Sequence, residues 1–195
     1  MISGIDTHIE TQNATEVIDV TGLIVAPGFV DMHTHSDFTL IADGRAESQV
    51  HQGVTTEVIG QCGASCAPVN SQDDIRRVAP WYTDKARHEP WLGFGDYLDV
   101  LDATDLGVNV MAFVGHGTVH RAVLGGELHP GEAEDVAEMA RLVDRCMDEG
   151  AGGLSSGLEY FPGILAAPEH LVPLCEVAAS YKRLYNPRPQ SRHAL

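Results

Sequence analysis

Lysine is scarce in this chain of 195 residues. Lys85 and Lys182 are its only lysines, against ten arginines and 28 acidic residues, and the formal net charge is -16 at pH 7. A surface this negative repels phosphate backbones and anionic lipid headgroups. We therefore expect neither a nucleic-acid partner nor a membrane partner.

Long apolar runs and a cysteine framework are lacking as well. No apolar run is long enough to cross a bilayer, and the chain shows no signal-peptide pattern, so we predict a cytoplasmic protein. The four cysteines are not spaced as a disulfide framework. Cys62 and Cys66 form a C-x3-C motif without a second pair, which disfavours a structural zinc knuckle, whereas Cys146 and Cys175 fall in helical patterns typical of core thiols.

Strand and helix patterns alternate along the chain without hairpin signals. We predict strands over 28–32, 54–59, 108–114 and 153–156, and the start of a fifth over 183–186. The clearest helix covers 132–149, and another is expected to start properly near Pro173, because proline breaks a helix interior. This alternation predicts a parallel α/β sheet. A complete (β/α)8 barrel needs ~250 residues, so the patterns leave open either half a barrel or a small open sheet.

Two histidines follow the first predicted strand. In Ala26–His35 (APGFVDMHTH), His33 and His35 are two positions apart, and residues i and i+2 on a strand point to the same side, so the two imidazoles aim together. Two ligands of one metal ion must lie on the same side in this way. Two polar residues at the end of a strand, without a metal, would show the same spacing. The second predicted strand ends in Gly60-Gln61-Cys62-Gly63, and Cys62 could add a soft thiolate ligand.

These stretches, together with residues 53–68 (GVTTEVIGQCGASCAP), 114–121 (VGHGTVHR) and 153–162 (GLSSGLEYFP), resemble the amidohydrolase superfamily and, within it, the N-acyl-D-amino-acid deacylases (D-aminoacylases). The resemblance covers most of residues 17–185. It implies the N-terminal half of a (β/α)8 TIM-type metal-dependent hydrolase barrel over residues 26–195, with strands 1–4 and the start of strand 5. Residues 1–25 would be the remnant of a small β-sandwich domain.

The chemistry that the resemblance implies is hydrolysis of the amide C–N bond of N-acyl-D-amino acids, small molecules, with one or two Zn²⁺ ions. His33, His35 and Cys62 are the implied metal ligands, and Cys62 takes the place of a carboxylated lysine found in many relatives. Glu159 and Tyr160 would line the substrate pocket, although Glu159 could equally be a solvated loop carboxylate. His116 would line the site without binding the metal.

Other parts of the family's site have no counterpart in this sequence. The family uses histidines after the fifth and sixth strands and an aspartate after the eighth, which acts as general base. Arg188 stands where the fifth-strand histidine is expected, so we find no catalytic residue in this chain and expect an inactive, truncated fragment. Exposed edges and an apolar inner face then predict self-association.

The last residues are the least like the family. Pro187 and Pro189 are a poor continuation for a central strand. One choice of codons for Asn186–Arg192 encodes Thr-His-Val-Arg-Ser-His when it is read one base later, so a one-base frame shift is one hypothesis for this tail. Two alternative functions remain: another cyclic-amide or amino hydrolase of the superfamily, which the Cys62 turn disfavours, or a non-catalytic short product.

Overall fold

The computed structural model describes residues 4, 6, 14–71, 73–75, 91–125 and 127–188. Its strands form one parallel sheet in the order β1-β2-β3-β4-β5. The strands are β1 (Phe29–Asp31), β2 (Val54–Ile59), β3 (Asn109–Gly115), β4 (Gly153–Gly157) and β5 (Leu184–Arg188). The helices are α1 (Asp37–Ala42), α2 (Glu47–Val50), α4 (Phe94–Asp102), α5 (His116–Leu124), α6 (Ala133–Asp148), η1 (Gly163–Leu165) and α7 (Pro168–Ser180).

The register of β3 shows how the sheet curls. Its first half, Asn109–Ala112, pairs with β2, whereas its second half, Phe113–Gly115, pairs with β4. Such a stagger between neighbouring strands is what a closed parallel barrel requires. The predicted fold class, half of a (β/α)8 barrel, is therefore confirmed, with β1 and β5 as the two edges of the described sheet.

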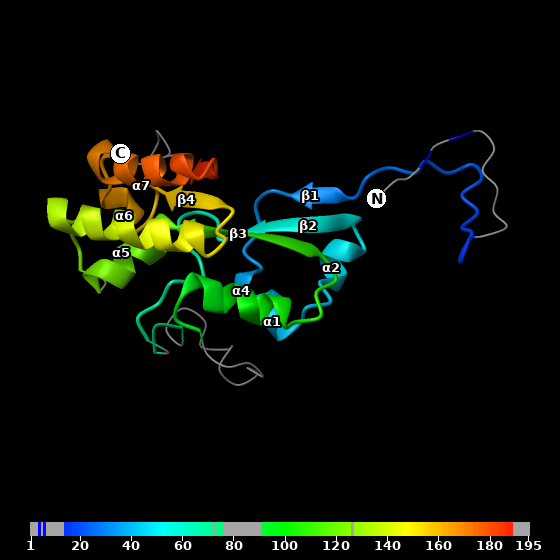
Figure 1. Ribbon diagram of the computed structural model, residues 1–195, viewed down its shortest axis with the longest axis horizontal. Coiled ribbons are helices and arrows are strands. Elements are labelled where there is room, and N and C mark those ends of the chain that lie inside the picture. Colours follow the sequence, from blue (N-terminus) through cyan, green and yellow to red (C-terminus); the bar gives the residue numbers. More distant parts are fainter. Residues whose placement is uncertain are drawn as a thin grey trace.

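One face of the sheet carries the helices and the core. Helices α1 and α4 lie below β1–β3, and α5, α6 and α7 surround β4 (Figure 1). Ile59, Val114 and Leu154 pack from the sheet into one apolar cluster with side chains from these helices. Helix α6 confirms the predicted helix within one residue at each end, because its apolar positions recur on one buried face and Gly150, with φ +114°, ends it.

The opposite face of the sheet is open. The strand register places Val30, Met111 and Leu184 on this side, away from the core cluster. Their exposed fractions are 53%, 40% and 53%. In a closed barrel this face would be the packed interior. Here Val58 and Phe113, on the same face, are buried, whereas Val30, Met111 and Leu184 contact solvent.

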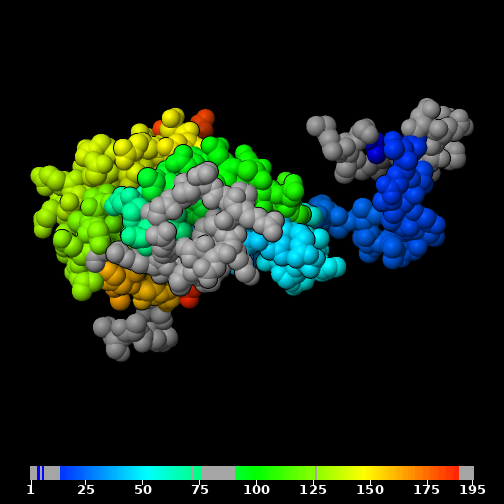
Figure 2. All heavy atoms as spheres, turned by 90° about the horizontal axis from the view of Figure 1, so that it is seen from below, coloured from blue at the N-terminus to red at the C-terminus, as the bar shows by residue number. Residues whose placement is uncertain are grey.

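The arm before β1 extends away from the body of the molecule (Figures 1 and 2). The strand-like runs at residues 16–20 and 23–25 form no strand, because no described segment lies alongside them to share backbone hydrogen bonds. Val17, Ile18 and Ile24 are exposed. The assignment of residues 1–25 to a small β-domain therefore stays a prediction.

Two expectations about proline are wrong. Helix α7 begins at Pro168 and continues through Pro173, because Leu171, Leu174 and Ala178 bury one face of it and offset the one lost backbone hydrogen bond. Strand β5 continues through Pro187, which pairs with Ser156. In the described sheet β5 is an edge strand, where a missing backbone donor is tolerated.

Other predicted features lie partly or wholly outside the described residues. Most of the long connection over 70–95 and all of the tail over 189–195 lie outside the described residues, so the predictions for these segments stay predictions. Trp91, which is described, is 1% exposed and donates its indole N–H to the Cys66 carbonyl at 2.9 Å. Among the described helices, none is both long enough and apolar enough to span a membrane.

Candidate metal centre

His33 and His35 leave the carboxyl end of β1 beside the end of β2. The Asp31 carboxylate accepts a hydrogen bond from the His33 backbone N–H at 3.0 Å, and the Thr34 N–H donates to the Val58 carbonyl at 3.3 Å. These two bonds hold the segment after β1 against β2. The imidazole centroids of His33 and His35 lie 5.5 Å apart. The same-side arrangement expected from their spacing is thus present.

Cys62 reaches the histidines from a glycine-flanked turn after β2. Its own φ is +57°, and Gly60 and Gly63 have φ values of +74° and +73°. A Cβ on Gly60 would lie 2.0 Å from the Phe113 carbonyl oxygen, so only glycine fits there. Ser155 holds both ends of the turn, since its hydroxyl donates to the Gly60 carbonyl at 2.5 Å and accepts from the Gly63 N–H at 3.0 Å.

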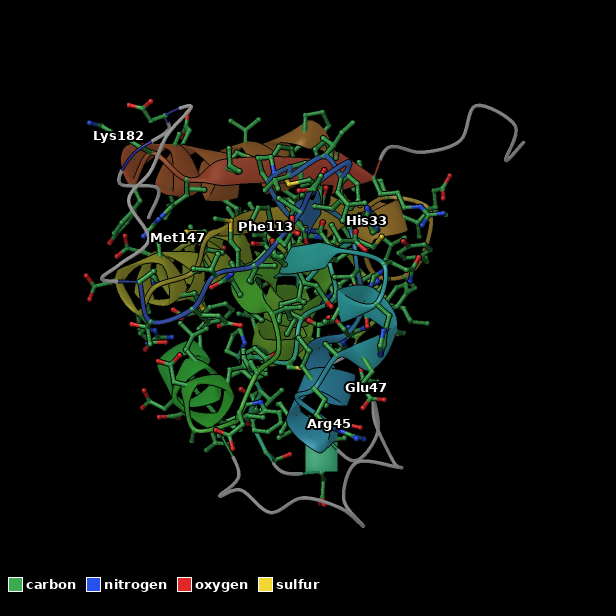
Figure 3. The ribbon with its side chains drawn as sticks, turned by 90° about the vertical axis from the view of Figure 1, so that its right-hand side faces the viewer. His33, Arg45, Glu47, Phe113, Met147 and Lys182 are labelled. Atoms are coloured by element: carbon green, nitrogen blue, oxygen red, sulfur yellow. The ribbon has the colours of Figure 1, made fainter. Side chains whose placement is uncertain are left out.

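The three side chains converge. His33 Nε2 lies 3.0 Å from Cys62 Sγ, and donor atoms of His33, His35 and Cys62 all lie within 4.8 Å of one another. Figure 3 labels His33, on the segment that follows β1. Two imidazoles and a thiolate are a donor set that suits zinc, and three protein ligands with an open fourth position are typical of catalytic zinc sites. Burial, with smaller contributions from His33 and Arg188, lowers the pKa of His35 and so favours its neutral form.

Arg188, Glu159 and Tyr160 surround the sulfur. Arg188 donates from Nη1 to Cys62 Sγ at 3.7 Å and from Nε to Glu159 Oε2 at 3.0 Å, and its guanidinium lies 5.6 Å from the centroid of the Tyr160 ring. Burial and the neighbouring Cys62 raise the pKa of Tyr160 to about 12. The structure thus brings the two predicted substrate residues beside the candidate metal ligands.

Sequence reasoning missed two residues that shape this site. It placed Arg188 at the end of the fifth strand but did not foresee that its guanidinium reaches Cys62 and Glu159. It also missed Glu57, fully buried on β2, which accepts a hydrogen bond from the Ser36 hydroxyl next to His35. An acidic residue inside a β-branched strand was the available signal, since a buried carboxylate needs a partner.

His116 lies apart from this group. It is the first residue of α5, is 1% exposed, and has no hydrogen-bond partner for either ring nitrogen among the described residues. Burial, reinforced by His120 and His170, lowers the pKa of His116 to about 4. It does not belong to the three-residue group formed by His33, His35 and Cys62.

The glycine turn generates a stability prediction. Gly60→Ala combines a left-handed φ with a clash against the Phe113 backbone. Backbone strain and overpacking each cost roughly 1–3 kcal/mol, so we expect this variant to lower the free energy of unfolding by more than about 2 kcal/mol. Gly125→Ala is the matched control, because Gly125 has φ +64° with no atom within 4 Å of the added Cβ. That variant should cost about 1 kcal/mol. Urea titrations followed by circular dichroism would measure both, and equal costs would contradict the clash at Phe113.

Known proteins are similar to this chain in sequence and in fold. Residues 16–183 match the sequence profile of the Amidohydrolase family. The chain is 37% identical over 168 residues to the D-aminoacylase of Alcaligenes xylosoxydans xylosoxydans, covering 86% of this chain and 34% of that protein. The N-acyl-D-aspartate deacylase of the same organism is 36% identical, with coverages of 82% and 32%.

Solved structures agree with this. A crystal structure of D-aminoacylase superimposes with a TM-score of 0.72 at 30% identity, covering 85% of this chain and 34% of that one. The N-acyl-D-glutamate deacylase of Bordetella bronchiseptica, complexed with zinc and a phosphonate inhibitor, gives a TM-score of 0.70 at 29% identity, with coverages of 85% and 34%. The chain spans about a third of the length of these relatives. The profile match over residues 16–183 shows that this chain belongs to the amidohydrolase family of metal-dependent hydrolases, which act on carbon–nitrogen bonds other than peptide bonds.

Proposed function

We propose that this chain supplies part of the metal centre of an N-acyl-D-amino-acid deacylase, with zinc as the metal. The observation that carries the proposal is the convergence of His33, His35 and Cys62 within 4.8 Å at the carboxyl ends of β1 and β2. Active sites of (β/α)8 barrels lie at this end of the strands. The similarity to D-aminoacylase and to the N-acyl-D-aspartate and N-acyl-D-glutamate deacylases supports the substrate class.

His33, His35 and Cys62 would hold the ion. When bound, zinc polarises a carbonyl oxygen and lowers the pKa of coordinated water toward ~7. The Tyr160 hydroxyl, whose pKa is raised further above neutrality, is protonated at neutral pH and can donate a hydrogen bond to an acyl substrate. Glu159, held by Arg188, would face the substrate's side chain from the same loop.

The chain would need other residues for turnover. A general base positions and activates the attacking water in such a reaction. The family resemblance assigns this role to an aspartate after the eighth strand, and the described sheet contains β1 to β5. We propose that the chain works in the cytoplasm on a small N-acyl-amino acid, and only together with those further residues.

A non-catalytic role is the second candidate, and one observation favours it. The Arg188 guanidinium occupies the end of β5 and contacts Cys62 Sγ at 3.7 Å. A fixed positive charge beside the sulfur competes with a metal cation for the same electron pair. In this interpretation, contacts within the protein alone hold His33, His35 and Cys62 together.

Zinc affinity tests the metal proposal. We expect His33→Asn and Cys62→Ser each to weaken Zn²⁺ binding at this site at least tenfold, about 1.4 kcal/mol, in a chelator competition assay. His51→Asn, an exposed histidine at the end of α2, is the control and should change nothing. Arg188→Gln should tighten binding if its charge competes with the ion. Unchanged affinity in Cys62→Ser would remove the thiolate from the ligand set.

Substrate preference tests the loop after β4. In a chimaera whose remaining strands come from the Alcaligenes D-aminoacylase, Glu159→Ala should raise kcat/KM for N-acetyl-D-glutamate relative to N-acetyl-D-leucine. The reason is that a negative charge is removed while Arg188 stays. Glu127→Ala, an exposed carboxylate paired with His129, is the control. An unchanged ratio would mean that Glu159 does not face the substrate.

The open face of the sheet generates a prediction about assembly. We propose that the isolated chain self-associates through this face, since Val30 on the edge strand β1 and Met111 on the central strand β3 both expose apolar surface on it. The double variant Val30→Lys/Met111→Lys should sediment as a smaller species than the wild type. Val172→Lys, at a 50% exposed site on α7, is the control. A wild-type monomer with one sharp unfolding transition would contradict this.

A further inference from the structure

A second pair of histidines lies in helix α5, outside the cluster described above. His116 and His120 are four residues apart, so their side chains lie one above the other on one face of the helix. Both are 1% exposed, and their ring centroids are 6.2 Å apart. Nitrogen–zinc bonds of ~2.0–2.1 Å place two imidazoles on one ion with centroids roughly 5–6.5 Å apart. The observed separation lies in this range.

The hydrogen bond of His120 shows which of its nitrogens is free. His120 Nε2 lies 2.8 Å from the His129 carbonyl oxygen, which can only accept, so Nε2 carries the proton. His120 Nδ1 therefore holds an unshared electron pair, and within the described part of the chain this buried atom has no partner. Metal-binding histidines typically donate their other ring N–H to a carbonyl or carboxylate in this way.

His116 is the more unusual residue of the pair. Both of its ring nitrogens are buried, and neither has a hydrogen-bond partner in the part of the chain that the structure describes, which is costly for a polar group removed from water. Because burial lowers its pKa to about 4, the ring is neutral at neutral pH and one nitrogen offers an electron pair. A metal ion would satisfy that nitrogen together with His120 Nδ1.

The surrounding charged groups define the rest of the site. Burial, the largest effect, lowers the pKa of His120, and so do the neighbouring His129 and Arg121. The hydrogen bond to the His129 carbonyl and the nearby Asp135, in the first turn of α6, raise it. His170 accepts the Ala167 backbone N–H on Nδ1 at 2.9 Å, so its other nitrogen bears the proton and it is not a third ligand. Water would complete the coordination.

We propose that His116 and His120 form a second metal site, which takes a borderline divalent transition ion such as Ni²⁺, Cu²⁺ or Zn²⁺ through His120 Nδ1 and one nitrogen of His116. Two neutral imidazoles do not suit Mg²⁺ or Ca²⁺, which require oxygen ligands. With two protein ligands, the site binds more weakly than a four-ligand zinc site. It is independent of the His33, His35 and Cys62 cluster, which contains neither residue.

We expect the ring of Phe161 to limit access to this pair. Its ring lies edge-on to His120, with centroids 6.3 Å apart and planes at 80°, and the residue is 38% exposed. It belongs to the segment between β4 and η1, so displacing one partly exposed ring opens a path from solvent to His120. Phe161→Ala should therefore speed metal association at least severalfold without changing the number of ions bound.

The test uses the full chain with His33→Asn, His35→Asn and Cys62→Ser, which removes the first cluster. With the first cluster removed, titration with Ni²⁺ should show one equivalent bound at the second site. The thermal midpoint should rise, because the ion binds the native state. His116→Asn or His120→Asn should weaken this binding at least tenfold. His170→Asn and His51→Asn are matched controls, one beside the pair and one far along the sequence, and both should bind as the parent does.

Electron paramagnetic resonance of bound Cu²⁺ gives a readout that needs no further variant. Coupling to two imidazole nitrogens in the triple variant that lacks the first cluster supports the site, even if the His116→Asn and His120→Asn variants fail to fold by circular dichroism. Absence of this Ni²⁺ equivalent would mean that the pair holds a buried water only, and would overturn the proposal. Full binding in folded His116→Asn and His120→Asn would overturn it as well.

Discussion

The hydroxyl of Ser155 holds together the part of the molecule on which the candidate centre depends. It donates to the Gly60 carbonyl and accepts from the Gly63 N–H, so a residue of β4 fastens both ends of the turn after β2. Cys62 lies between these ends in a left-handed conformation and points its sulfur toward His33. The position of one candidate ligand is thus set by a residue more than ninety positions away in the chain.

The two faces of the sheet have different roles in this arrangement. The helix-covered face buries Ile59, Val114 and Leu154 and makes the strands rigid, whereas the open face exposes Val30, Met111 and Leu184. Side chains held on strand ends by a rigid core are positioned more precisely than side chains on mobile loops. The His116–His120 pair lies on α5, which follows β3 directly. Both pairs of histidines therefore come after the carboxyl end of a strand, His33 and His35 after β1 and His116 and His120 after β3.

Local patterns predicted much of this fold. The apolar period of α6 and the β-branched run of β2 gave bounds within about one residue, because both elements bury one face and carry clear stop signals. Pro173 and Pro187 misled, since proline penalties are local and were offset by the buried face of α7 and by the edge position of β5. The i, i+2 spacing of His33 and His35, with Cys62 ending the next strand, predicted the three candidate ligands but not the contacts of Arg188.

The sequence by itself determined which residues can bind a metal and at which strand ends they lie, because strand periodicity and glycine turns are local properties of the chain. Tertiary structure alone decided the distances between them. Cys62 reaches His33, and Arg188 reaches both Cys62 and Glu159, only because the parallel register brings β1, β2, β4 and β5 to a common edge. Such contacts between distant residues depend on how the sheet curls and packs, and no local pattern encodes that geometry.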